Sequence, residues 1–103
     1  MGITAQLARY IVQTRYEDLP KSIVDLAKLK VLDTVGCALG GSQTSLGRAL
    51  IETMKELGGS AQSTIIGDGA RINAPHAGFA NALLCDALDF EDTYDIGKYG
   101  AAA

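Results

Sequence analysis

One stretch of the chain, residues 20–39, constrains the fold more than any other. Pro20 suits the first turn of a helix, because its fixed φ is already helical and the N–H that it lacks would have no partner there. After it, apolar residues recur at helical spacing and extend around much of the helix surface: Ile23, Leu26, Ala27, Leu29, Val31, Leu32, Val35, Ala38 and Leu39. A helix that is apolar on several sides is a central helix, packed by neighbours on more than one face.

Small and acidic residues interrupt this helix. Gly36 and Gly40 lie four residues apart, a spacing that lets another helix backbone come close. We expect Gly40 and Gly41 to end the helix through a left-handed cap. Asp33 is an acid inside the apolar stretch, so its carboxyl needs a hydrogen-bond partner or a cleft to face. We expect its role to be structural.

Three further helices are predicted from their capping and turn residues. Thr4 is expected to cap a first helix that carries apolar residues at helical spacing. Ser45 is expected to open a third helix, which the glycine pair at 58–59 closes. Pro75 marks the first turn of a fourth helix. The chain is therefore predicted to be mainly helical.

A short β-hairpin is predicted between the third and fourth helices. Residues 63–66 (Ser-Thr-Ile-Ile) indicate a strand, and residues 67–71 indicate a turn into a second strand at Ile72. On the fourth helix, Asn81 is expected to hydrogen-bond a neighbouring backbone. His76 is expected to cap this helix or to lie on the surface, because no acid or serine stands at a matching spacing for catalysis. The expected fold class is mainly α with a short β-hairpin.

Charge and cysteine content exclude several classes of function. Nine lysines and arginines against twelve aspartates and glutamates give a net charge of −3, whereas a nucleic-acid-binding surface needs clustered positive charge. One histidine and two widely separated cysteines, Cys37 and Cys85, cannot supply the ligands of a zinc site. With no basic leader and no apolar run of about 20 residues, we expect a cytoplasmic protein with no membrane partner and with buried, reduced thiols.

The acidic segment near the end of the chain is the candidate for chemistry. Five acids fall within ten residues, with Lys98 as the nearby base: Asp86, Asp89, Glu91, Asp92 and Asp95. Packed closely, like charges raise one another's pKa, so that one acid can hold a proton near neutrality and act as a general acid or base. On a solvated surface they would do nothing of the kind, and spacing alone favours the solvated interpretation.

Two structures are possible for this segment, a calcium-binding loop and a continuation of the fourth helix. A calcium loop is disfavoured, because Tyr94 stands where the sharp turn needs glycine and Gly100 where it needs a bidentate glutamate. If the fourth helix continues, Asp89 and Thr93 lie one turn apart on the same face. There a carboxyl and a hydroxyl could hydrogen-bond a small polar substrate, and the aromatic residues Phe90 and Tyr94 would wall the site or pack beneath it.

The order of several motifs is similar to that of a known family. The chain carries Y-E-D-L-P at 16–20, K-L-K-V-L-D-T-V-G-C-A-L-G-G at 28–41, S-T-I-I-G at 63–67, Asn81 within 78–82, and A-L-D-F-E-D-T-Y-D at 87–95. Together these motifs resemble the N-terminal part of the MmgE/PrpD family, which includes 2-methylcitrate dehydratase, cis-aconitate decarboxylase and iminodisuccinate epimerase.

The resemblance implies a fold and an activity. It implies a large, mainly helical domain and a smaller α/β lid domain, usually in a homodimer, with the active site between them. Residues 1–103 would be an N-terminal fragment of the helical domain, with the lid domain absent. The resemblance also implies a lyase or isomerase that needs no metal, iron–sulfur cluster or other cofactor, and that acts on small di- or tricarboxylates by proton transfer next to a carboxylate.

The resemblance also implies site residues. Asp89 and Thr93 match the first aspartate and the threonine of the family's L-D-F-D-D-T motif, which line its active site, and are expected to be catalytic. Asp92 is expected to bind substrate together with them, by orienting the threonine, and no metal ligand is expected. The family's histidine soon after the threonine is missing here, and whether Tyr99 replaces it stays open.

The charge balance limits what this chain can do alone. A tricarboxylate would be repelled by a segment of net charge −3 unless basic groups arrive from elsewhere. We therefore expect an inactive polypeptide that needs further protein to complete its site and that forms homo-oligomers through exposed apolar faces. Two alternatives are a non-catalytic helical interaction or dimerisation module, and an incompletely built product.

Overall fold

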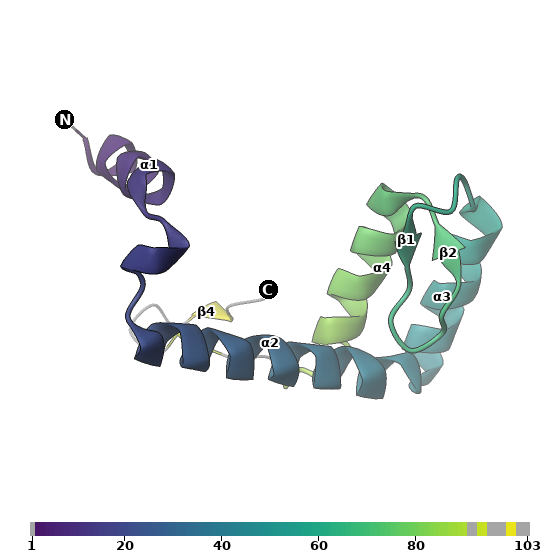
Figure 1. The fold of residues 1–103 in the computed structure, drawn as a ribbon. Helices are drawn as coiled ribbons and strands as arrows, with labels where there is room; N and C mark the ends of the chain where they lie inside the picture. The colour runs from purple at the N-terminus through teal and green to yellow at the C-terminus, as the bar shows by residue number, and fades with distance from the viewer. Residues whose placement is uncertain (1, 91–92, 95–98, 101–103) are drawn as a thin grey trace.

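A computed structural model describes residues 2–90, 93–94 and 99–100 of the chain. The elements along the chain are α1 (Ile3–Gln13), the 3-10 helix η1 (Tyr16–Asp18), α2 (Lys21–Ser42), α3 (Ser45–Leu57), β1 (Ser63–Thr64), β2 (Arg71–Ile72), α4 (Ala74–Asp86), β3 (Thr93–Tyr94) and β4 (Tyr99–Gly100). Figure 1 shows α3, α4 and the β1–β2 hairpin gathered at one end of α2, with α1 at the other. The predicted mainly α fold is confirmed.

One end of the molecule has a closed hydrophobic core. Its buried members come from four helices and strands and from the hairpin turn: Ala38, Ile51, Met54, Ile65, Ile72, Ala77, Ala80 and Leu84. Ile65 and Leu84 are the largest side chains that are fully buried. We call this part of the chain, residues 37–88, the folded end.

Glycines bring α2 and α4 into close contact at the folded end. A Cβ atom on Gly41 would overlap the carbonyl oxygen of Leu84, and one on Gly40 would lie 2.8 Å from Cδ1 of Leu88. The prediction that Gly40 and Gly41 end the helix is wrong, because α2 continues to Ser42. Their lack of a side chain serves helix packing here instead of a left-handed cap.

The hairpin forms as predicted, with shorter strands. β1 and β2 pair antiparallel, with Ser63 opposite Ile72. The turn between them contains Gly67 and Gly69, at φ values of 84° and 87°, a region that favours glycine because it has no Cβ. β1 ends at Thr64, although the N–H of Ile65 still donates to the carbonyl oxygen of Ala70 across the hairpin at 2.9 Å.

Asn81 fastens the hairpin to α4. Its Oδ1 accepts a hydrogen bond from the backbone N–H of Ile66 at 2.9 Å, and its Nδ2 donates to the carbonyl oxygen of Thr64 at 3.0 Å. These two bonds continue the hydrogen bonding of the strand where its own ladder stops. The predicted structural role of Asn81 is confirmed.

Side-chain caps fix the starts of α3 and α4. Thr44 caps α3 by accepting a hydrogen bond from the N–H of Gly47. Asn73 caps α4 by accepting from the N–H of His76 at 2.9 Å, and its amide lies 2.8 Å from the Nδ1 atom of His76. His76 therefore belongs to the cap, as predicted. α1, by contrast, begins at Ile3 without a side-chain cap, so the prediction of Thr4 as its capping residue is wrong.

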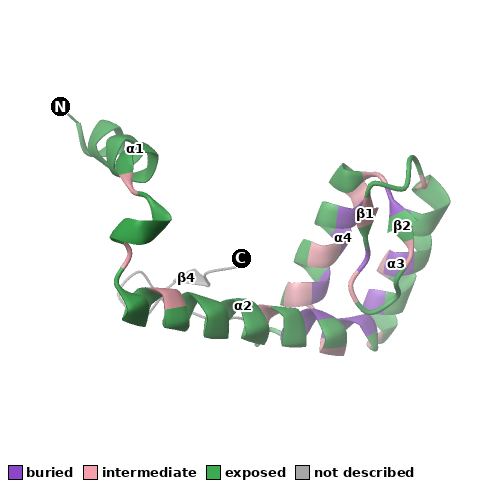
Figure 2. Cartoon of the chain, viewed as in Figure 1, coloured by how far each residue is buried: buried purple, intermediate pink, exposed green. Residues whose placement is uncertain are grey.

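The other end of the molecule is an open arm. We call residues 2–36, comprising α1, η1 and the first part of α2, the arm; none of its residues is buried (Figure 2). Its exposed apolar residues include Ile3, Leu7, Tyr10, Ile11, Val12, Ile23, Leu26, Leu29, Val31 and Leu32. The radius of gyration is 16.5 Å, whereas a compact chain of this length would have about 13 Å. The sequence predicts neighbours on more than one face of the central helix, whereas the described residues bury α2 only from Cys37 onward and leave its earlier part exposed. Within the described part of the chain, none of the helices combines the length and apolar character that crossing a bilayer requires.

Candidate functional site

A groove runs between α2 and the segment that follows α4. It measures about 630 Å³ and is lined by Leu29, Leu32, Asp33, Gly36, Cys37, Leu88 and Phe90. Five of these residues lie on α2, at the junction of the arm and the folded end. The lining is apolar apart from the carboxyl of Asp33 and the thiol of Cys37.

Asp89 stands in the chain between Leu88 and Phe90, which line this groove, but it is not itself one of the lining residues. α4 ends at Asp86, and the backbone N–H of Asp89 donates to the carbonyl oxygen of Asp86 at 2.9 Å. Asp89 has a φ of 55°, and among the described residues no other non-glycine residue has a positive φ. Aspartate and asparagine tolerate this left-handed conformation better than most residues do. Its side chain is exposed.

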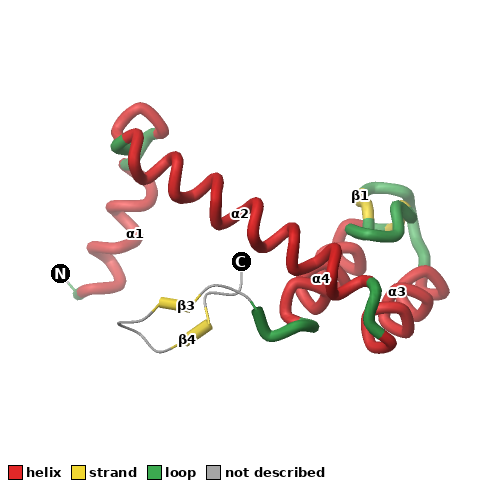
Figure 3. The backbone as a smooth tube through the Cα atoms, turned by 90° about the horizontal axis from the view of Figure 1, so that it is seen from below, coloured by secondary structure: helices red, strands yellow, loops and turns green. Residues whose placement is uncertain are grey.

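The left-handed turn at Asp89 changes the predicted geometry of the site. Continuation of α4 would have placed Thr93 one turn beyond Asp89, but the helix stops before either residue. Thr93 lies instead in β3, opposite Gly100 of β4. The condition under which Asp89 and Thr93 would share a helix face, continuation of α4, is therefore not met. Figure 3 shows β3 and β4 between α1 and α4, apart from the folded end.

Part of the predicted site lies outside the described residues. This applies to Asp92, together with Glu91, Asp95 and Lys98 of the acidic segment. For Thr93 and Tyr99, the structure describes the backbone pairing and not the side chain. The assembly of Asp89, Asp92 and Thr93 into one site stays a prediction, and so does the replacement of the family's histidine by Tyr99.

Asp33 is the acidic residue in the lining of the groove. Its side chain is exposed and lines the groove that α2 shares with Leu88 and Phe90, and its expected structural role stays a prediction. The signal for this was already present in the sequence, because a lone carboxyl inside an apolar helix requires either a partner or a cleft. The structure supplies the cleft.

The two thiols lie on the facing helices α2 and α4. Cys37 is buried, as predicted, whereas Cys85 is half-buried, and neither forms a disulfide. Burial raises the pKa of the Cys85 thiol above its ordinary value, and the nearby Cys37 adds to the rise. The Cys85 thiol is therefore protonated near neutrality. Among the described residues, no group of three or more histidine, cysteine, aspartate or glutamate side chains could hold a metal ion.

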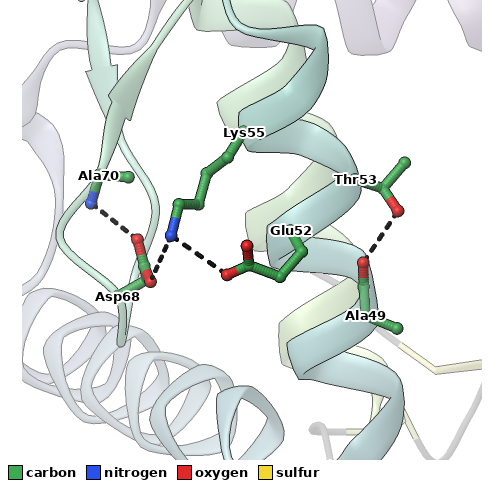
Figure 4. Close-up of polar contacts among 6 residues, drawn as sticks. All are labelled: Ala49, Glu52, Thr53, Lys55, Asp68 and Ala70. Carbon is green, nitrogen blue, oxygen red and sulfur yellow. Dashed lines mark hydrogen bonds and ion pairs between the residues drawn. The ribbon is translucent and has the colours of Figure 1, made fainter.

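A second polar cluster, on the folded end, is structural. Lys55 lies 3.1 Å from Glu52 and 3.5 Å from Asp68, which joins α3 to the hairpin turn (Figure 4). Asp68 also accepts a hydrogen bond from the N–H of Ala70 within the turn at 3.1 Å. The hydrogen bond with Glu52, followed by the charge of Asp68, raises the pKa of Lys55 above 10.5. Asp68 and its two glycine neighbours thus form a hairpin turn, as predicted.

Comparison with known proteins identifies the family. The model of the MmgE/PrpD N-terminal domain matches residues 5–103, almost the whole chain. The chain belongs to the MmgE/PrpD family. Its helices, its hairpin and its groove therefore belong to the N-terminal part of an MmgE/PrpD domain.

Two distant relatives are named for cis-aconitate decarboxylase activity. The cis-aconitate decarboxylase of Aspergillus terreus is 21% identical over 102 residues, which cover 99% of this chain and 21% of that protein. The cis-aconitate decarboxylase-like protein oryM of Aspergillus oryzae matches with the same identity and coverage. The chain spans about a fifth of the length of these relatives. No solved structure gives a significant match.

Proposed function

We propose that this chain is the N-terminal helical part of a cofactor-independent lyase or isomerase that acts on small di- or tricarboxylates. Family membership supports this, and so do the decarboxylase names of two relatives. In the proposed site, Asp89 and Thr93 are the catalytic residues, and both bind substrate together with Asp92. In the proposed domain organisation, residues 1–103 form an N-terminal portion of the family's helical domain.

The placement of Asp89 is the observation that carries this proposal. Asp89 has an exposed carboxyl and stands in the chain between two residues that line an apolar groove, in a backbone conformation that glycine adopts with less strain. Strained backbone is found preferentially at functional sites. If further protein covers the groove, the loss of water around Asp89 favours its neutral form, which would suit it to take up and release a proton.

The proposed enzyme is incomplete in this chain. The net charge is −3, and a carboxylate substrate requires cations around it. We therefore propose that the chain alone has no turnover, that the missing basic residues come from the later part of the family's polypeptide, and that the assembled protein is a homo-oligomer. A cytoplasmic location is proposed because neither Cys37 nor Cys85 forms a disulfide.

A helical interaction or dimerisation module is the second candidate function. The exposed apolar surface of the arm favours it, because patches of more than a few hundred Å² mark interaction sites. Such a module would associate stably with itself and would remain inactive in every mixture. This behaviour separates it from the enzyme.

The test is an assay of the chain with and without a polypeptide that supplies the later part of the family's sequence. Consumption of di- and tricarboxylates, cis-aconitate first, is followed by proton NMR. The enzyme proposal expects turnover only in the mixture. Stable self-association without turnover in any mixture would favour the module instead.

Two substitutions then test the residues. Asp89→Asn keeps the shape and tolerates the same φ, but it removes the titratable proton, so the rate should fall by about 10²–10⁴-fold. Thr93→Val should also lower the rate, whereas a loss confined to substrate affinity would make Thr93 a positioning residue. Glu56→Gln removes the same charge from α3 and should leave the rate unchanged. An unchanged rate in Asp89→Asn would remove Asp89 from the mechanism.

A further inference from the structure

We propose that the groove between α2 and Leu88–Phe90 receives a helix from the later part of an MmgE/PrpD polypeptide, and that this helix seats a cationic side chain against Asp33. The inference rests on the proposed function and names the partner that completes the same site. It is carried by the exposed apolar lining, by a second apolar surface on the far side of α2, and by the position of Asp33.

The groove exposes apolar surface that requires cover. Leu29 is 63% exposed and Phe90 is 72% exposed, although both line the same groove as the buried residue Cys37. Burial of apolar surface stabilises by about 25 cal/mol per Å². A helix that packs in the groove would bury the leucine side chains of α2 together with Leu88 and Phe90.

A second copy of this chain is the weaker candidate for the occupant. α2 has another apolar surface, lined by Tyr16, Leu19, Val24, Ala27, Lys28 and Val31. At about 100° per residue, Leu29 and Val31 lie on nearly opposite sides of the helix. A copy related by a two-fold axis covers one side of a helix and leaves the opposite side open.

The relatives contain enough additional chain to cover both sides. The match spans 21% of their length, so about four-fifths of each relative lies outside it. A helix that is covered on opposite sides is the central helix of a larger domain. The later part of the polypeptide is therefore the occupant that accounts for both apolar surfaces of α2.

Asp33 determines which charge the covering helix must bring. Once the groove is covered, its carboxylate loses water, and a buried charge without a partner is strongly unfavourable. A lysine or arginine opposite Asp33 offsets this loss, whereas an acidic or purely apolar helix does not. Asp33 thus selects the partner by charge, and the apolar lining supplies the contact area.

A pair of helical peptides tests the proposal without any assay of activity. Each has about 20 residues and the same leucine and alanine stripe. One carries a lysine at the centre of the stripe, and the other a glutamate. Binding to the 103-residue chain is measured by fluorescence anisotropy at low salt, and the contact is mapped by amide chemical shifts.

The proposal expects the lysine peptide to bind at least about tenfold more tightly than the glutamate peptide, with shifts at residues 29–37 and 88–90. Asp33→Asn should abolish this preference, and Asp25→Asn, two turns earlier on α2, should preserve it. Leu29→Gln should weaken the binding of both peptides. The matched control is Leu46→Gln on α3, which should leave the binding unchanged, because Leu46 is 64% exposed but lies outside the groove.

Three results would overturn the proposal: equal or absent binding of the two peptides, shifts located elsewhere, or a discrete dimer of the chain that occupies the groove. The peptide measurement does not depend on turnover. Loss of the preference for the lysine peptide in Asp33→Asn would support this inference even if the reconstituted protein were inactive, so the two proposals can fail separately.

Discussion

The folded end and the arm are built from similar residues and differ in what covers them. Leu84 on α4 is fully buried, while Leu29 on α2 is 63% exposed, although each is a leucine on an apolar helix. α2 itself passes from one environment to the other, because its buried residues begin at Cys37. Apolar composition thus sets which surfaces require burial, and the presence of a neighbouring element decides whether burial occurs. At the folded end that element lies within this chain.

The largest expected difference is between two leucine deletions. Leu84→Ala leaves a cavity in the core and should destabilise the folded end by about 2–5 kcal/mol. Leu29→Ala removes exposed surface from the arm and should change the stability by less than about 0.5 kcal/mol. Urea unfolding followed by circular dichroism measures both. A loss in Leu29→Ala as large as that in Leu84→Ala would contradict the distinction.

Two glycines of α2 extend the comparison along one helix. Gly41→Ala places a Cβ against the backbone of Leu84 and should destabilise the α2–α4 contact by about 1–3 kcal/mol. At Gly36 a Cβ meets nothing within 4 Å, so Gly36→Ala should be neutral or should stabilise the helix by up to about 1 kcal/mol. Thermal unfolding of the two variants gives the sign of each effect. Equal destabilisation would place the boundary of the folded end before Gly36.

Asn81 tests whether the hairpin depends on α4. Asn81→Ala leaves the partly buried N–H of Ile66 without its acceptor and should destabilise the folded end by about 1–2 kcal/mol. Asn81→Asp keeps the acceptor and loses the donor to Thr64, so it should destabilise less than alanine does. Amide exchange of Ile66 reports the loss directly. Unchanged protection of this amide in Asn81→Ala would show that the bond does not hold the hairpin.

Lys55 gives the smallest effect, and a pH-dependent one. Its pKa is raised in the folded state, so the stabilisation is fully present below about pH 10.5 and is lost as the pH rises further. Lys55→Gln should therefore flatten part of the decline in melting temperature above pH 10. Lys21→Gln, in the exposed ion pair with Asp25 of the arm, should leave the decline unchanged. If the melting temperature of Lys55→Gln and of the parent protein depended on pH in the same way, the contact of Lys55 with Glu52 and Asp68 would not contribute to stability.

Elements with strong local signals were predicted correctly. Pro20, Pro75 and the glycines of the hairpin turn act through their own backbone preferences, so the sequence alone locates the second helix, the fourth helix and the turn. Asn81 was predicted to bond a backbone because a polar amide on a small apolar face needs a partner. Its actual partners, 15 and 17 residues away, became known only from the structure.

The errors occurred where tertiary contacts override local preference. Gly40 and Gly41 are suited to a helix end, but the approach of α4 uses them inside the helix. The helical spacing of Asp89 and Thr93 gave no warning of a left-handed φ at Asp89, because that conformation is set by the termination of α4 and not by periodicity. The membership of Asp89, Asp92 and Thr93 in one site stays a prediction, whereas the backbone geometry at Asp89 could not be predicted from spacing.

Hydrogen exchange of the monomeric chain at low concentration is the most direct test of the claim that the arm awaits a covering polypeptide. The account predicts slow exchange for the amides of α3, α4 and α2 from Cys37 onward, and fast exchange for α1 and residues 22–35. The covering polypeptide should then slow the exchange of residues 22–35. Protection of these residues equal to that of α4 in the monomer alone would contradict the account, because it would show that the arm is already stable without a partner.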